Sequence, residues 1–326
     1  MNNYRVSVLV TFYNQADCVD KALGSIVSQK TTFGVKIIIG DDGSSDGTCD
    51  IVRKWIQRYP DSIELHVMDR DNGVNAPGFR ASRNRINLIN YVDTDYYIFL
   101  DGDDYYCYEE KLQKQVDILD SKVNADCIAC GHNTGMLYKN GIIRPFTDSE
   151  LKEGKIDPQG YWKKYHIHTD ALLFRKSVIS HIDTGLLENG FNDNMITFPA
   201  LRYGKIYYIN EVWAYYVQTD DGIWTGGEEV INLVRQMIFY DLSNRINPRM
   251  KNQTICKFGY AWEGLYEIRH CIDTDKLMEY ADEARDKGCK NALRWICYPG
   301  LGMTGRLGLL IKTWFIKLVT PLFYRL

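Results

Sequence analysis

The sequence lacks an overall excess of positive charge: 39 lysine and arginine residues stand against 42 aspartate and glutamate residues, a net charge of −3. Proteins that grip duplex nucleic acid usually carry a basic excess, so we expect no nucleic-acid partner. The balance hides an asymmetry, because the 40 residues after 286 contain seven basic residues and no acidic one. A basic, apolar tail on an acidic body predicts that the tail contacts a membrane surface.

Long uncharged apolar runs are also missing. No window of about 20 apolar residues is free of charge, so we expect no conventional transmembrane helix. The N-terminal segment has no long apolar stretch and no small-residue cleavage site, so we expect no signal peptide. Residues 307–318 have the pattern of an interfacial helix with snorkelling lysines, although a helix that packs on the domain or on a partner subunit would look the same. Together these features predict a cytoplasmic protein, peripheral at the inner face of the cell membrane.

The nine cysteines form no disulfide framework. An odd number of scattered cysteines indicates reduced thiols in a cytosolic compartment. Cys127 and Cys130 form a CxxC within an apolar segment that has no second pair, so we interpret them as part of a buried strand.

Two common nucleotide-binding loops are absent. Residues 11–23, which follow the first apolar run, contain no glycine, so a dinucleotide-binding GxGxxG is excluded there. A P-loop is absent from the sequence as well. These absences argue against a dinucleotide-binding dehydrogenase and a P-loop protein.

Apolar β-branched runs alternate with amphipathic stretches over the first 131 residues. Such alternation predicts βαβ units and an α/β fold with a mainly parallel sheet. We expect strands at 5–12, 35–40, 63–68, 96–100 and 126–131, and helices at 16–29, 46–58, 80–91 and 108–121. Two short strands are expected at 205–209 and 212–217. From residue 228 the pattern is helical, which predicts one domain over 1–227 and a C-terminal helical extension over 228–326.

Acidic residues follow several of the predicted strands. Asp41 and Asp42 end the second strand, and Asp101, Asp103 and Asp104 end the fourth. Because parallel strands end at one edge of a sheet, these carboxylates should gather there, which costs energy unless a cation or a donor neutralises them. Oxygen ligands of this kind suit a divalent cation, Mg²⁺ or Mn²⁺.

Three segments, VSVLVTFYN, IIIGDDGSSDGT and YYIFLDGDD, occur in this order and resemble the inverting, nucleotide-sugar-dependent glycosyltransferases of family 2. The resemblance covers residues 4–220. It implies a GT-A fold with a nucleotide-binding half over 1–131 and an acceptor half over 132–227. It also implies transfer of a sugar from a UDP-sugar to a hydroxyl of a growing, lipid-linked cell-surface glycan.

The resemblance also implies roles for single residues around the nucleotide. Thr11 and Tyr13 would contact the uracil and the ribose. Asp42 would accept the uracil N3–H, with Asp41 assisting. The family's NxGxxxARNxG segment is only partly matched by Asn72-Gly73 and the later Ser82-Arg83-Asn84-Arg85. Arg83 is the predicted donor-binding arginine, with Arg80 and Arg85 as competitors.

The same resemblance implies the metal ligands and the catalytic base. Asp101 would touch the ribose and, with Asp103, hold the divalent cation, and Asp104 is a third candidate ligand. Asp193, in an Asn192-Asp193 pair where the family usually has two acidic residues, is the predicted general base, although it could equally cap a helix.

Alternatives remain for a few features. His166 and His168 form an HxH that could be a metal pair in a strand, but packing or acceptor contact is the favoured interpretation. Trp224 is either a lid over the donor or a hydrophobic anchor. For the whole chain, the alternatives are a catalytically inactive, membrane-associated scaffold and a sugar nucleotidyltransferase.

Overall fold

The computed structural model describes residues 3–70, 77–147, 151–158, 161, 167–182, 197, 199–219, 229–246, 248, 251–268, 282, 284, 285, 288–290 and 292. The chain divides into two compact units, Met1–Asp221 and Gly222–Leu326. Each is described by itself below.

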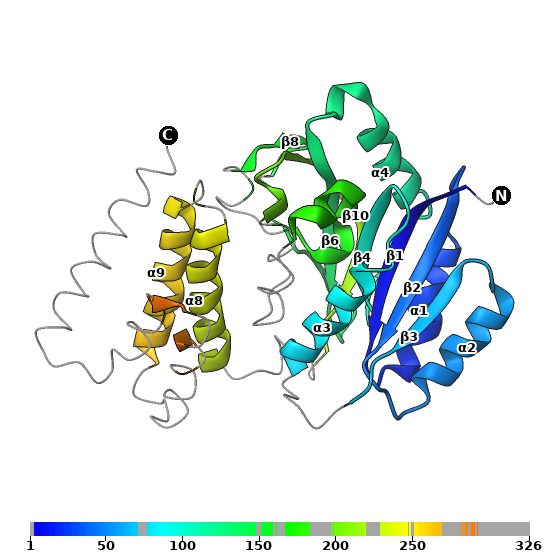
Figure 1. Cartoon of the computed structure of the whole chain (residues 1–326), viewed down its shortest axis with the longest axis horizontal. Coiled ribbons are helices and arrows are strands. Elements are labelled where there is room, and N and C mark those ends of the chain that lie inside the picture. The colour runs from blue at the N-terminus through cyan, green and yellow to red at the C-terminus, as the bar shows by residue number, and fades with distance from the viewer. Residues whose placement is uncertain are drawn as a thin grey trace, which may run out of the picture. The chain divides into compact units, whose positions relative to one another are not determined.

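The first unit is built on one mixed sheet (Figure 1). Its first part is parallel, in the order β3-β2-β1-β4, and consists of β1 (Tyr4–Phe12), β2 (Gly34–Asp41), β3 (Ile63–Val67) and β4 (Tyr96–Asp101). These bounds match the predicted strands to within one residue at each end. The predicted α/β fold with a mainly parallel sheet is confirmed.

The sheet changes direction beyond β4. The short strand β9 (Leu173–Arg175) runs antiparallel to both β4 and β6 (Cys127–Leu137). β6 then pairs in parallel with β10 (Lys205–Val217), whose far side meets β5 (Tyr105–Tyr106). Two hairpin partners, β7 (Ile143–Pro145) and β8 (Gly154–Ile156), pair with β6 and β10. The two predicted strands at 205–209 and 212–217 are wrong: they are one strand, whose register shifts between Ile209 and Ala214 absorb the break in the pattern.

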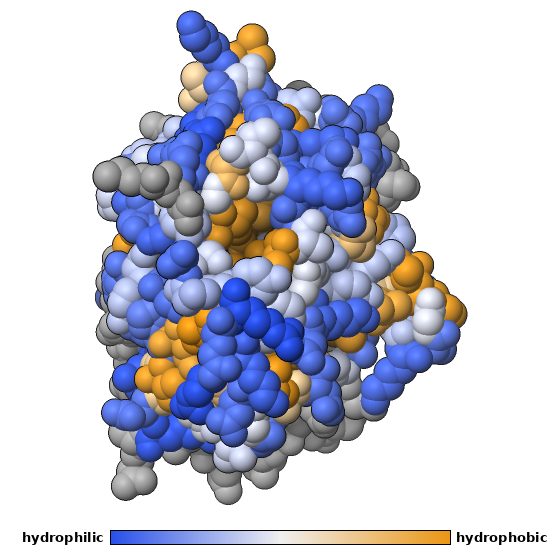
Figure 2. All heavy atoms as spheres, turned by 90° about the vertical axis from the view of Figure 1, so that its right-hand side faces the viewer, coloured by the Kyte–Doolittle hydropathy of each residue, from blue (hydrophilic) through white to orange (hydrophobic). Residues whose placement is uncertain are grey.

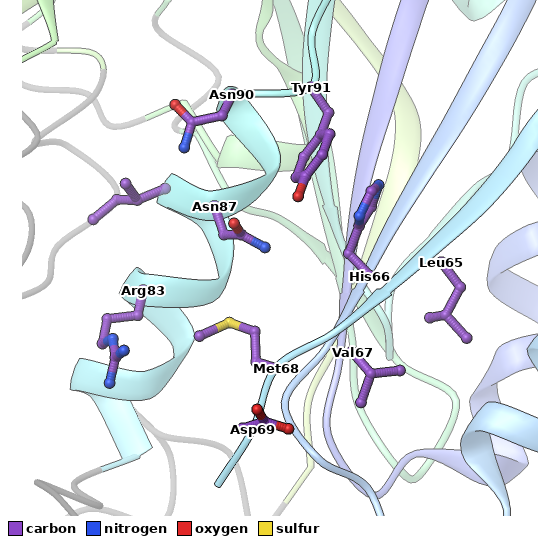
Figure 3. Close-up of a pocket in the computed structure, with 10 residues that line it drawn as sticks. Leu65, His66, Val67, Met68, Asp69, Arg83, Asn87, Asn90 and Tyr91 are labelled. Carbon is purple, nitrogen blue, oxygen red and sulfur yellow. The ribbon is translucent and has the colours of Figure 1, made fainter. Parts of the chain in front are cut away.

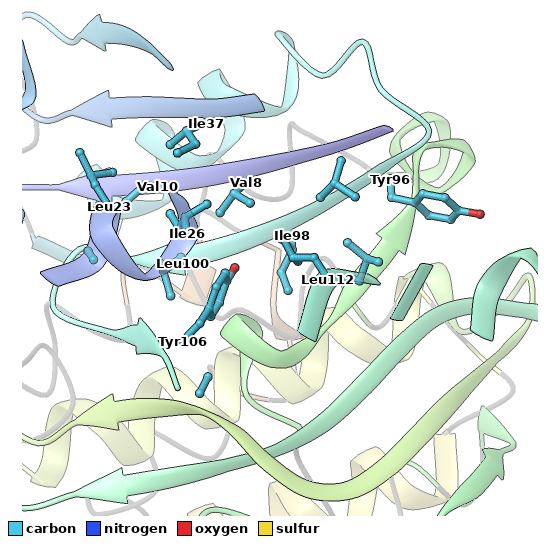
Figure 4. Packing of buried hydrophobic residues seen from close by; sticks show 14 of the residues in the cluster. Val8, Val10, Leu23, Ile26, Ile37, Tyr96, Ile98, Leu100, Tyr106 and Leu112 are labelled. Atoms are coloured by element: carbon cyan, nitrogen blue, oxygen red, sulfur yellow. The ribbon is translucent and has the colours of Figure 1, made fainter. Parts of the chain in front are cut away.

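Helices cover both faces of the parallel part. Alternate β1 residues such as Val8 and Val10 pack against α1 (Ala16–Val27) and α4 (Lys111–Asp120), as Figure 4 shows for part of this cluster. α2 (Thr48–Arg58) packs beside α1, and α3 (Pro77–Ile89) covers the opposite face, where it contacts β1 and β2. Burial on both faces explains why β1 and β4 are almost continuously apolar.

Figure 2 shows the surface on the side of α1 and α2. It is mainly hydrophilic, and the hydrophobic colour is confined to separate patches. α2 buries Thr48 and Val52, and its partly buried Ile51, Trp55 and Ile56 also pack against the core.

The described part of the second unit consists mainly of α8 (Glu229–Ile246) and α9 (Lys251–Glu267), which pack against each other. Val234 and Met237 of α8 and Trp262 and Leu265 of α9 are buried. Among the described residues, we find no helix with the length and apolarity needed to cross a membrane. Most of the predicted helix at 274–287 and the amphipathic segment 307–318 lie outside the described residues.

Candidate functional site

The carboxyl ends of β1, β2 and β4 meet at one edge of the sheet, as the parallel arrangement predicts. Phe12 is in register with Asp41, and Thr11 with Asp101. The pairing continues past the strands, because the Asp42 N–H donates to the Phe12 carbonyl (3.0 Å) and the Gly102 N–H to that of Thr11 (2.9 Å). A Cβ on Gly102 would lie 2.2 Å from Cδ1 of Phe12, so the acidic loop can pass this close to β1 only with glycine there.

Asp42 is held by a buried arginine from α3. Nε of Arg80 lies 2.8 Å from each carboxylate oxygen of Asp42, and the side chains are 2% and 6% exposed. Arg70 donates through Nε to the Asp42 carbonyl (3.1 Å). A charge-assisted pair of this geometry fixes the Asp42 carboxylate firmly at the end of β2.

Asp101 pairs with a second arginine of α3. Arg85 donates to Oδ1 of Asp101, which also accepts a hydrogen bond from Thr11 Oγ1 (3.2 Å). Asp101 keeps 30% of its side chain exposed, so it remains accessible to a ligand. Burial, and then the negative charge of nearby Asp101, raise the pKa of Asp103 to about 6. Burial and a neighbouring carboxylate both disfavour the charged form of Asp103, and a cation bound beside it would favour that form.

The rim of this edge carries an aromatic ring. Tyr13 is 40% exposed, and the guanidinium of Arg70 lies 3.9 Å from the centre of its ring. Below it, Asp41 is fully buried and accepts hydrogen bonds from the Ser44 backbone N–H (2.8 Å) and hydroxyl (2.6 Å). Asp41 therefore shapes the turn after β2, whereas Tyr13 offers a flat, exposed face.

A second acidic group lies deeper in the fold. Asp104, His168 and Asp170 each offer one ligand atom, and these atoms lie within 4.8 Å of one another. Asp104 is 1% exposed and accepts the backbone N–H of Val217 (2.9 Å). Oδ1 of Asp170 lies 2.9 Å from His168 Nδ1 and accepts the Thr134 hydroxyl at the same distance. Burial, followed by the charges of neighbouring aspartates, raises the pKa of Asp104 well above its ordinary value.

Sequence reasoning missed two basic groups near this cluster. Lys111 is fully buried, donates to Gln115 Oε1 (3.0 Å) and lies over the ring of Tyr106; burial lowers its pKa to about 7. Burial likewise lowers the pKa of His132 to about 3. A signal for Lys111 was present, because Lys111 and Gln115 share the apolar face of α4 at a spacing of four residues.

Several predicted site residues lie elsewhere. Arg80 and Arg85, the competitors of Arg83, are the arginines that pair with Asp42 and Asp101. Arg83 lines a separate cavity of about 690 Å³ between β3 and α3. Figure 3 shows Asn87 and Tyr91 facing His66 and Met68 across this cavity, with the rings of His66 and Tyr91 stacked at 3.7 Å.

Other predicted residues cannot be located in the structure. Asp193, the predicted base, lies outside the described residues, as do His166 and Trp224. His168 was expected in a strand. It instead directly precedes the short 3₁₀ helix η2 (Thr169–Ala171), and its backbone is extended but lies outside the strands of the sheet. Its ring stacks on that of Tyr216, with 4.5 Å between the ring centres.

Comparisons with known proteins bear on the family and the fold of this chain. Residues 7–183 match the model of glycosyl transferase family 2. An uncharacterized protein of Mycobacterium bovis is 26% identical over 228 residues, which span 67% of this chain and 60% of that protein. A processive diacylglycerol beta-glycosyltransferase of Mycoplasma pneumoniae is 35% identical over 103 residues, 31% of this chain and 28% of that protein. The chain thus spans less than two thirds of the length of either relative.

Two solved structures share the fold. S. aureus TarS 1–349 in complex with UDP-GlcNAc has a TM-score of 0.56 at 17% identity and covers 90% of both chains. The mannosyltransferase PcManGT of Pyrobaculum calidifontis, in complex with GDP-Man and Mn²⁺, has a TM-score of 0.54 at 14% identity, over 95% of this chain and 86% of that one. At these identities the likeness concerns the GT-A architecture alone. The family match covers more than half of the chain, and with the acidic strand ends it establishes that this chain belongs to glycosyl transferase family 2.

Proposed function

We propose that this glycosyltransferase is an inverting, metal-dependent enzyme that moves a sugar from a UDP-sugar to a hydroxyl of a growing, lipid-linked cell-surface glycan. The observation that carries the donor part is the convergence of Tyr13, Asp42, Asp101 and Asp103 at one sheet edge, with Asp42 and Asp101 each paired to an arginine of α3. Open α/β sheets bind their ligands at this edge.

The nucleoside would occupy the space beside Tyr13. Its exposed ring offers a stacking surface, and Asp42, held in place by Arg80, supplies an acceptor for the imide N–H of uracil. Thr11 and Asp101 would face the ribose. Arg83, on the same helix as Arg80 and Arg85, remains a candidate contact for the donor.

The donor's diphosphate would be bound with a divalent cation by Asp101 and Asp103. The residues fit such an ion, because Asp101 and Asp103 are partly exposed oxygen ligands that lie two residues apart, at and just after the end of β4. A cation bound there offsets the charge that builds on the leaving diphosphate. Asp104 is left out of this ligand set, because its side chain is buried and anchored to the backbone of Val217.

Asp193 would act as the general base. It would accept the proton of the acceptor hydroxyl while that oxygen attacks the anomeric carbon from the face opposite the diphosphate. One displacement of this kind inverts the configuration. The proposal for this residue is supported by its place in the sequence alone.

The acceptor and the location follow from the charge asymmetry of the chain. The basic tail after residue 286 would bind the anionic inner face of the cell membrane, which brings the enzyme to a lipid-linked acceptor. The Mycoplasma pneumoniae relative is named for a lipid acceptor, diacylglycerol, and this supports the proposal.

The donor proposal is tested by thermal melting of the full chain with UDP, GDP, CDP or dTDP, each with and without Mn²⁺. A nucleotide at about 100 times its dissociation constant stabilises the folded state by about 2.7 kcal/mol. We expect an Mn²⁺-dependent shift with UDP that is lost in Asp103→Ala and kept in Asp50→Ala, a control at an exposed carboxylate of α2. A shift with GDP or dTDP alone would contradict the role of Asp42, and no shift with any nucleotide would contradict the donor site.

A further inference from the structure

A cluster of buried acidic side chains is not used by the proposed transfer reaction. Asp104, His168 and Asp170 are 1%, 7% and 1% exposed, so a donor diphosphate in solvent cannot reach them. Their ligand atoms nevertheless lie within 4.8 Å of one another. We propose that these three residues form a second cation site, which holds a transition-metal dication as a structural element separate from the cation at the donor diphosphate.

The first argument is the state of the carboxylate oxygens. Asp104 uses Oδ1 to accept the N–H of Val217, and Asp170 uses Oδ1 to accept the hydroxyl of Thr134. Oδ2 of each residue is buried and, among the described residues, has no hydrogen-bond partner. Leaving a buried polar atom unsatisfied costs about 1–3 kcal/mol, and more when the group is charged. A shared cation would satisfy both oxygens at once.

The second argument is the charge balance of the interior. Asp104 and Asp170 are each 1% exposed, and their ligand atoms lie within 4.8 Å of one another. Two basic groups lie nearby: His168 Nδ1 is 2.9 Å from Oδ1 of Asp170, and the ammonium of the buried Lys111 is directed at Gln115 Oε1. Neither group is hydrogen-bonded to Oδ2 of Asp104 or Asp170 within the described part of the chain, so a cation there would offset buried negative charge.

The ligand types indicate the class of ion. One imidazole nitrogen with two carboxylate oxygens suits Zn²⁺ or Mn²⁺, whereas Mg²⁺ prefers oxygen ligands and keeps several waters. The cluster also joins distant parts of the first unit: the loop after β4 supplies Asp104, and the segment at η2 supplies His168 and Asp170. An ion here would tie these segments together.

The experiment uses the full chain after removal of metal with a chelator, and no nucleotide. Mn²⁺ is added and the bound fraction is measured by electron paramagnetic resonance, while Zn²⁺, Mn²⁺ and Mg²⁺ are compared by thermal melting. We expect one tightly bound Mn²⁺ per chain in the wild type and in Asp103→Ala. Zn²⁺ or Mn²⁺ at about 100 times its dissociation constant should raise Tm by about 5 °C or more, and Mg²⁺ much less.

Variants separate loss of the ion from loss of the fold. Asp170→Asn and His168→Gln should abolish the bound Mn²⁺ and the metal-dependent rise in Tm. Thr134→Val is the matched control, because it removes a hydrogen bond to the same Asp170 oxygen without removing a ligand, and it should keep the ion.

Two outcomes would overturn the proposal. One is a wild-type chain that binds no Mn²⁺ or Zn²⁺ without nucleotide, in which case water or a shared proton fills the cluster. The other is binding that Asp103→Ala abolishes and Asp170→Asn preserves, which would locate the ion at the donor loop. Neither result depends on the donor nucleotide, so failure here is distinguishable from failure of the proposed function.

Discussion

The buried pair of Asp42 and Arg80 gives the sharpest test of how the nucleotide end of the site is held. Arg80→Met removes the guanidinium and leaves the Asp42 carboxylate with 6% of its side chain exposed and its bidentate partner gone. Removing one partner of a buried ion pair costs about 3–5 kcal/mol. For a unit of this size that corresponds to a fall in Tm of about 10 °C.

The same reasoning predicts a specific ranking of single and double variants by stability. Asp42→Asn/Arg80→Met removes both charges, so it should be more stable than Arg80→Met by about 2 kcal/mol or more. Arg53→Met is the matched control, because Arg53 pairs with Asp50 on the surface, where the two side chains are 58% and 76% exposed. It should change the free energy of unfolding by less than about 1 kcal/mol.

The assay is urea unfolding of the four chains at one pH and salt concentration, with circular dichroism as the probe. Two results would refute the reasoning. One is an Arg80→Met chain within about 1 kcal/mol of wild type, which would mean that the Asp42 carboxylate is solvated or protonated at little cost. The other is a double variant no more stable than Arg80→Met, which would mean that the two side chains do not interact.

Two further predictions concern the interior of the first unit. The pKa of His132 is about 3 in the folded chain and about 6.5 in the unfolded chain. Between these pH values only the unfolded chain binds a proton at His132, so the folded chain loses stability as the pH falls below 6.5. His132→Gln should therefore reduce the loss of stability between pH 7 and pH 5 by about 2 kcal/mol, measured by urea unfolding at both pH values, and equal losses in the two chains would contradict the assignment. Gly40→Ala would bring a Cβ within 2.0 Å of Asn84 Oδ1 and should cost about 1–3 kcal/mol. Gly24 lies in helix α1, and a Cβ there would meet only Trp55, at 3.8 Å. Gly24→Ala should therefore stabilise the chain by about 0.5–1 kcal/mol in the same urea assay. A loss of stability in both the Gly40 and the Gly24 variants would contradict this distinction.

The part of the fold up to β4 could be predicted from the sequence, because the signals for its strands and turns lie within short segments of the chain. The strands up to β4 are short apolar runs bounded by turn residues, and a parallel sheet buries both of their faces. The beginning of β6 was predicted as well. Its extension to Leu137 was not, because that part is polar and is stabilised by pairing with β10, which lies some 70 residues further along the chain.

The three arginines of α3 show which part of the site could not be predicted from the sequence. Arg80, Arg83 and Arg85 all lie on one helix, and their order in the sequence does not reveal which face of that helix packs on the sheet. The face is set by tertiary contacts such as the hydrogen bond from Asn84 to the carbonyl of Gly40 (2.9 Å). In the folded chain Arg80 and Arg85 reach the carboxylates of Asp42 and Asp101, whereas Arg83 lines the cavity beside β3.

The hydrogen bond between Asp104 and the backbone of Val217 joins residues 113 positions apart, and it has a consequence for synthesis on the ribosome. At 5–20 residues per second, about 6–23 s pass between the addition of Asp104 and that of Val217. Until Val217 is added, the loop that holds Asp104 lacks this anchor. Once β6 is complete at Leu137, its edge also stays unpaired until β10 follows. An unpaired strand edge can pair with another chain, so a pause in synthesis between Leu137 and Val217 would lengthen this exposure.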